Sequence, residues 1–214
     1  MSPPKGSQGL GREDPRPRDS ERMSLPSNIE VLVPTSAPQP GRLVRVGDVV
    51  EGPAFDLRAV VLETNRDLLR AEVDAGKRGN GGPLHRHLRQ EERFLVREGV
   101  LRVRDGFRRS RLVEPGGEVA IPPGRPHTFS VVSDGAHFIA EFRPAWHIAE
   151  VFRDVFALSV GGRVDRRGRP RLTDLLALSE RYPEDFFYAP VIPPALQRAI
   201  GRFVARRQGT PPSG

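Results

Sequence analysis

Short runs of alternating hydrophobic and polar residues occupy the middle of the chain. They are separated by turns rich in Gly, Pro and Asp and lie at 43–46, 58–62, 68–73, 94–96, 100–103, 119–121, 127–132 and 136–142. Alternation with a period of two is typical of strands that bury one face. Many short strands between such turns predict an all-β sandwich or barrel.

The hydrophobic period changes after Pro144. Apolar residues then recur three and four positions apart, at Ile148, Val151, Phe152, Val155 and Phe156. This spacing predicts an amphipathic helix. We expect a second helix from Thr173 to near Tyr182 and a third over 195–206, because proline at 193 and 194 fits a first helical turn. The apolar faces of these helices must pack against the outer sheet, the open mouth of the barrel or a partner subunit.

The chain divides by composition into four parts. Residues 1–27 are rich in Pro, Gly, Ser and mixed charge, which predicts a disordered tail. A short strand at 29–33 and a linker at 34–40 would precede the strands of the barrel. The expected boundaries are therefore a barrel over 28–143, a helical extension over 144–207 and a short disordered tail over 208–214.

Length and composition favour one modest domain with an appendage. The chain has 214 residues, of which 37% are hydrophobic, and it contains no cysteine, so neither disulfides nor thiolate ligands are expected. No apolar stretch reaches the roughly 20 residues of a membrane span, and the N-terminus has no apolar stretch of a signal peptide. These features predict a cytoplasmic protein that does not associate with membranes.

The net charge of +7 comes mainly from the region after residue 143. Arginine is concentrated there in one segment, at positions 163, 166, 167, 169 and 171. Such a segment is usually a solvated surface, and the sequence contains no nucleic-acid-binding motif. A nucleic-acid partner is therefore not expected.

Three of the five histidines are placed as metal ligands would be. His85 and His87 are two positions apart, so on a strand they project to the same face, and Glu92 and His127 follow. Imidazole nitrogens and one carboxylate suit a divalent first-row metal and leave coordination positions open. We therefore predict one bound Fe, Mn, Ni or Zn ion.

Strand parity selects Glu92 over Glu91 as the carboxylate ligand. Glu92 shares its face with the apolar residues Phe94 and Val96, whereas Glu91 shares its face with arginines. By the same argument His127 shares its face with Phe129 and Val131. His147, near a predicted helix start, is expected to lie outside the site.

The spacing of these residues resembles the two motifs of the cupin superfamily. Gly79, His85, His87, Glu92 and Gly99 follow the pattern G-x5-H-x-H-x4-E-x6-G, and Gly116, Pro122, Gly124 and His127 follow G-x5-P-x-G-x2-H. The resemblance implies a double-stranded β-helix, a jelly-roll barrel, with His85, His87, Glu92 and His127 binding a metal inside it. One position departs, because Val131 stands where the second motif usually has Asn.

The rest of the chain is similar to small bacterial cupins with a C-terminal helical extension. The similar residues run from Glu141-Phe142-Arg143-Pro144 to Pro193-Pro194. Proteins of this type often pair through their sheets, so we expect a homodimer. The helices would then lie near the interface or over the barrel mouth.

These features predict a metal-dependent enzyme that acts on a small organic molecule, and oxygenase chemistry is the first choice. A metal-dependent isomerase, epimerase or lyase is an alternative, and so is a non-catalytic metal- or ligand-binding or sensing module. The residues expected to line the cavity are Phe94, Val96, Phe129, Val131 and His137. No catalytic residue beyond the metal ligands can be assigned from the sequence.

Overall fold

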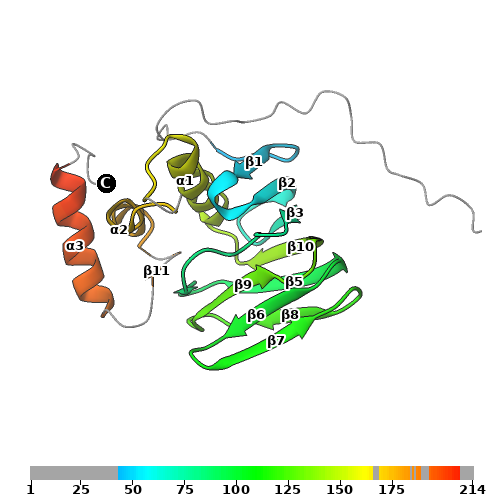
Figure 1. Ribbon diagram of the computed structural model, residues 1–214. Helices are drawn as coiled ribbons and strands as arrows, with labels where there is room; N and C mark the ends of the chain where they lie inside the picture. Colours follow the sequence, from blue (N-terminus) through cyan, green and yellow to red (C-terminus); the bar gives the residue numbers. More distant parts are fainter. Residues whose placement is uncertain (1–42, 166–168, 184, 186, 189–192, 208–214) are drawn as a thin grey trace, which may run out of the picture.

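The computed structural model describes residues 43–165, 169–183, 185, 187–188 and 193–207 (Figure 1). The predicted tails at 1–27 and 208–214, the strand at 29–33 and the linker at 34–40 lie outside these residues. Within the described part, no helix is both long and apolar enough to cross a membrane.

Strands form two antiparallel sheets. The first has the order β1 (Val49–Gly52), β2 (Leu57–Thr64), β3 (Leu69–Gly76), β10 (Gly135–Arg143), β5 (Glu91–Glu98) and β8 (Glu118–Ile121). The second has the order β11 (Phe187–Tyr188), β4 (His85–Arg86), β9 (His127–Val131), β6 (Leu101–Asp105) and β7 (Arg109–Val113). A short 3-10 helix, Pro53–Phe55, joins β1 to β2.

The strand order is that of a double-stranded β-helix. Between β3 and β10 the chain passes back and forth between the sheets, so that β3-β10-β5-β8 faces β4-β9-β6-β7. Each sheet therefore pairs strands that are distant in the sequence, as two Greek keys do in a jelly roll. The predicted fold class is confirmed by this order and by the helices that follow.

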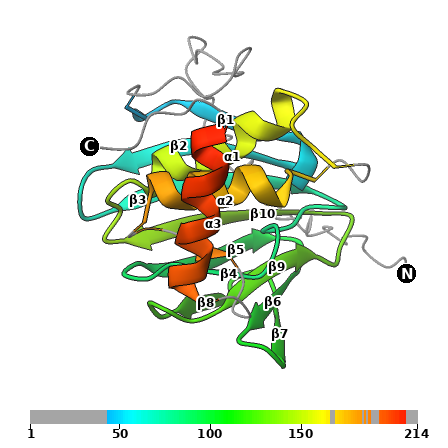
Figure 2. The same ribbon diagram turned by 90° about the vertical axis from the view of Figure 1, so that its left-hand side faces the viewer.

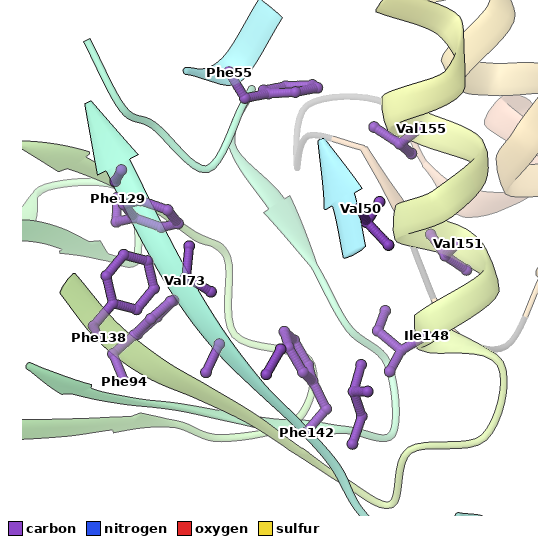
Figure 3. Packing of buried hydrophobic residues seen from close by; sticks show 14 of the residues in the cluster. Val50, Phe55, Val73, Phe94, Phe129, Phe138, Phe142, Ile148, Val151 and Val155 are labelled. Atoms are coloured by element: carbon purple, nitrogen blue, oxygen red, sulfur yellow. The ribbon is translucent and has the colours of Figure 1, made fainter. Parts of the chain in front are cut away.

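The inner faces of the two sheets meet in a core with an aromatic centre. The rings of Phe94, Phe129 and Phe138 pack edge to face, with centroids 5.3 to 5.9 Å apart (Figure 3). This arrangement is favoured by the ring quadrupoles. Phe94 and Phe138 are almost fully buried, and they come from neighbouring strands of the same sheet.

The C-terminal extension forms three helices, as the hydrophobic period predicts. They are α1 (Ile148–Val160), α2 (Leu172–Arg181) and α3 (Pro194–Arg207). Helix α1 packs against β1, α2 packs against both α1 and α3, and α3 is the outermost layer (Figures 1 and 2). Helix α1 therefore lies against β1, the edge strand of the first sheet.

A buried carboxylate joins α1 to α2. Asp154 of α1 is fully buried and accepts hydrogen bonds from Tyr182 Oη at 2.8 Å and Arg181 Nη1 at 3.1 Å, while Arg153 contacts its other oxygen. Burial first, and then the charge of Asp154, raises the pKa of Tyr182, so the phenol stays protonated and donates. These contacts hold α1 in a fixed position relative to the helix behind it.

Three strand predictions are wrong or incomplete. Residues 43–46 do not form a strand: Leu43 and Val46 are 70% and 64% exposed, and Asp48 turns the chain by accepting a hydrogen bond from Arg45 N. Strand β7 was not predicted, because it is an edge strand with four exposed residues and shows no alternation. The two-residue strand β11 depends on pairing with β4 and has no local signal.

Candidate metal centre

Both sheets contribute residues to the cluster that the sequence predicts. His85 begins β4 and stands opposite His127 on β9 in the second sheet, whereas Glu92 lies on β5 in the first. His87 follows the end of β4, so the strand is shorter than expected, but its ring still reaches the same point. Glu92 points into the barrel as its parity predicts, and Glu91 is half-buried on the outer face.

The four side chains surround one point. Their ligand atoms all lie within 4.8 Å of one another, and all four residues are buried. Glu92 Oε2 is 2.5 Å from His127 Nε2 and 3.4 Å from His87 Nε2. Three imidazoles and one carboxylate at this separation fit a divalent metal site.

Backbone carbonyls orient the three rings. The Nδ1 atoms of His85, His87 and His127 lie 2.9, 3.1 and 2.8 Å from the carbonyl oxygens of Pro83, Asp185 and Arg125. A carbonyl can only accept, so each Nδ1 carries a proton and donates it. This leaves Nε2 as the nitrogen that can bind a metal, which is how outer partners set the ligating atom of a histidine.

The electrostatics of the cluster favour an ionised Glu92 carboxylate beside a neutral His85 imidazole. Burial, together with the charges of His127 and His87, holds the pKa of His85 well below its usual value, so that ring is neutral. Burial alone would raise the pKa of Glu92, but the charge and hydrogen bond of His127 and the contact with His87 lower it well below its usual range. Glu92 is therefore ionised and available to balance a cation.

His127 responds to the same carboxylate in the opposite direction. Burial alone would lower the pKa of its imidazole, but the charge and hydrogen bond of Glu92 raise it. A cation is therefore stabilised beside Glu92 at this position. The donor set and its charge both fit the predicted metal.

A cavity of about 110 Å³ extends from the cluster to α1. His85, Glu92 and His127 of the cluster line it, and so do Phe152 and Val155 of α1. Most of the remaining wall is aliphatic or aromatic, and part of it is shown in Figure 3. The metal centre therefore faces a dry pocket rather than open solvent.

Two of the five predicted lining residues, Phe94 and Phe129, line this cavity. Val96 and Val131 do point inward and are buried, but each lies two residues further along its strand, beyond the phenylalanines and away from the cluster. Strand parity gives the face of a residue and not its depth in the barrel.

The prediction for His137 is wrong. Its neighbours Ala136 and Phe138 are the inward-facing residues of β10, so its ring lies on the outer face, where Nε2 is 2.8 Å from Glu72 Oε1. His147 lies outside the cluster, as expected, with its ring 3.3 Å from Asp185 Oδ2.

Sequence reasoning did not identify Asp185, which connects the extension to the metal centre. Its carboxylate is buried and accepts hydrogen bonds from Gln90 Nε2 at 2.6 Å and His147 N at 3.2 Å, and its carbonyl orients His87. Next to it, β11 pairs with β4, with Tyr188 opposite His85. No local pattern could have found this residue, because His87 and Gln90 lie 98 and 95 positions earlier and His147 lies 38 positions earlier.

The described arginines of the 163–171 segment are engaged within the extension. Arg163 pairs with Asp174, and Arg169 pairs with Asp165 through two nitrogens. Arg171 donates to the carbonyl of Val164. The described acidic partners of this segment are therefore Asp174 and Asp165; positions 166–168 lie outside the described residues.

No protein-family model and no curated protein matches the sequence. Solved structures resemble less than half of the chain. An RmlC-like cupin from Shewanella frigidimarina is 23% identical and covers 45% of this chain and 83% of its own, with a TM-score of 0.41. KdgF from a Halomonas species is 20% identical and covers 42% of this chain and 79% of its own, with a TM-score of 0.39.

A third similar structure is described as a sugar phosphate isomerase of the cupin superfamily from Silicibacter pomeroyi. It is 22% identical and covers 42% of this chain and 61% of its own, with a TM-score of 0.38. Of these three structures, the first and the third are described as cupins. The fold itself is established by the strand order described above.

Proposed function

We propose that this protein is a mononuclear metal enzyme that acts on a small organic molecule, with oxygenase chemistry as the first candidate. The observation that carries the proposal is that His85, His87, Glu92 and His127 form one cluster, and that three of them, His85, Glu92 and His127, line a mostly apolar cavity. A site that only stabilised the fold would need no cavity beside it, since structural metal sites are closed.

The four side chains would hold the metal, and three nitrogens with one carboxylate leave room for further ligands. A divalent ion there supplies Lewis acidity and, if it is redox-active iron, the capacity to use dioxygen as an oxidant. Glu92 contributes the single negative charge that balances the cation. The carbonyls of Pro83, Arg125 and Asp185 keep the three rings oriented before any substrate enters.

The surrounding residues keep water away from the reacting molecule. Phe94, Phe129 and Phe142 form part of the wall next to the cluster, and Phe152 of α1 packs on Phe142 with ring centroids 5.1 Å apart. Exclusion of water strengthens electrostatic interactions within a site and protects reactive intermediates. Substrate binding would therefore occur beneath α1.

The test is elemental analysis of the purified protein followed by turnover measurements. We expect about one divalent metal per chain, and we expect the iron-loaded protein to consume dioxygen while converting one of a panel of candidate metabolites, followed by mass spectrometry. His127→Ala should abolish conversion, whereas the matched variant His137→Ala, which changes a histidine on the outer face, should retain it.

The other outcomes identify the alternatives. A product formed without oxygen uptake would indicate an isomerase, epimerase or lyase. A ligand that is bound but returned unchanged under every metal, with oxygen present, would indicate a binding or sensing module. Absence of metal after reconstitution with Fe, Mn, Ni and Zn in turn would contradict the proposal. The homodimer stays a prediction, which light scattering can check.

A further inference from the structure

Few polar side chains line the cavity. Among the described lining residues they are His85, Glu92 and His127 of the cluster, together with Asn80. The rest of the lining consists of glycine, proline and apolar residues. A ligand that fills this space therefore meets hydrogen-bonding side chains at its head and hydrocarbon along its body.

Asn80 is not available to a ligand, because its own loop uses its amide. Its Oδ1 accepts a hydrogen bond from Gly82 N at 2.9 Å, and its Nδ2 donates to Arg78 O at 2.9 Å. The neighbouring backbone is also occupied: Gly81 N donates to Phe129 O, and Gly82 O accepts from Thr128 Oγ1. Hydroxyl groups on the body of a ligand would thus lose their water partners without replacement.

The charge of the lining leads to the same conclusion. No arginine or lysine is among the described residues that line the cavity, so among them a phosphate or second carboxylate away from the cluster would meet no counter-charge. Burying such a group is strongly unfavourable, whereas an apolar body gains free energy by leaving water. A metal at the cluster, by contrast, accepts an oxygen anion.

The size of the cavity limits the ligand. Its volume of about 110 Å³ is smaller than the cavity of about 150 Å³ that holds one benzene ring. A short hydrocarbon chain fits this space. A larger body would have to extend beyond the cavity or displace part of its wall, to which α1 contributes Phe152 and Val155.

We propose that the site binds a small, mostly apolar molecule with one oxygen-bearing head at the metal cluster, and that it discriminates against polyhydroxylated and phosphorylated compounds. This inference rests on the proposed metal site for the position of the head. The selectivity for the body depends on the apolar wall and is measured separately below.

The experiment compares two carboxylates of the same length, pentanoate and 4-hydroxybutanoate, which differ by a terminal methyl and a terminal hydroxyl. Binding to the zinc-loaded full-length protein is measured by calorimetry. We expect pentanoate to bind at least about tenfold more tightly, because the hydroxyl would be buried without a partner. Equal binding, tighter binding of 4-hydroxybutanoate, or no binding of either compound to the metal-loaded protein would overturn the inference.

A pair of variants tests whether the wall causes the selectivity. Val73 of β3 lines the cavity and can be seen in Figure 3, whereas Val96 is equally buried on an inner face but does not line it. Val73→Thr adds one hydroxyl at nearly constant volume and should reduce the preference for pentanoate several-fold. Val96→Thr carries the same change and should leave the preference unaltered. An equal loss of preference in both variants would mean that a general loosening of the core is responsible.

Metal content measured on the same samples separates this inference from the proposed function. If the protein holds no metal but still prefers pentanoate, the proposed function is contradicted, whereas the inferred preference for an apolar body is supported. A protein that holds one metal and prefers 4-hydroxybutanoate would retain the metal centre and refute the ligand class.

Discussion

The barrel and the C-terminal extension both reach the metal centre, but they supply different parts of it. The barrel provides all four candidate ligands from three strand regions, within 43 residues of one another in the chain. The extension provides the side of the cavity formed by α1 and, through Asp185, the outer partner of His87. The comparison teaches that the residues that would bind a metal can lie close together in the sequence, whereas the residues that enclose the site and orient its ligands can lie far from them.

The largest effect is expected when a barrel ligand is removed. His85→Ala should lower metal affinity by more than about 100-fold, because losing a ligand costs more than losing an outer partner, which typically costs 10–100-fold. Competition with a chromogenic chelator measures the affinity. His137→Ala, on the outer face, is the matched control and should bind metal normally. Equal losses in both variants would mean that the cluster is not the metal site.

A large loss of stability is expected when the junction between α1 and α2 is broken. Asp154→Ala leaves Arg153, Arg181 and Tyr182 without their shared acceptor, and breaking a buried ion pair of this kind costs about 3 kcal/mol. Urea unfolding measures the change in the free energy of unfolding. Asp134→Ala, in an exposed pair with Lys77, should leave the unfolding midpoint unchanged. If Asp154→Ala is equally harmless, α1 does not depend on α2 for its position.

A smaller effect is expected for the outer partner of His87. Asp185→Ala removes the carboxylate that fixes this segment to Gln90 and His147, so the carbonyl that orients His87 should be held less firmly and metal affinity should fall by about 10-fold. The visible spectrum of the cobalt-loaded protein should change as well, which a loss of stability alone would not produce. Asp165→Ala, elsewhere in the extension, is the control. An unchanged affinity and spectrum would show that the barrel holds the metal unaided.

The smallest effect is expected at the other end of the chain. Deletion of residues 1–26, which are predicted from composition to be disordered, should leave both the melting temperature and the metal content unchanged. Scanning calorimetry and elemental analysis check this. A lower melting temperature would show that the N-terminal tail stabilises the barrel as the C-terminal extension does.

Sequence reasoning predicted the fold and the clustering of the four candidate ligands because both depend on local patterns. The period-two alternation gives Phe94 and Phe129 their inward face, and the same parity selects Glu92 over Glu91. It placed Val96 and Val131 too near the candidate metal site, because alternation gives the face of a residue but not its depth in the barrel. It also placed His137 among the inward-facing residues, whereas in β10 its neighbours Ala136 and Phe138 face inward. Asp185 lay outside any local pattern, since its contacts exist only after the extension has packed on the barrel.

The pairing of β11 with β4 has a consequence for how the protein is made. His85, His87, Glu92 and His127 are all synthesised before Asp185 and Tyr188, which complete the surroundings of His87 and the edge of β4 about a hundred residues later. Contacts that are so distant in sequence form late in folding, and the N-terminal parts of a chain fold first during synthesis. A nascent barrel on the ribosome would therefore have its four candidate ligands, but His87 would lack the carbonyl that orients it until the chain is long enough to include Asp185.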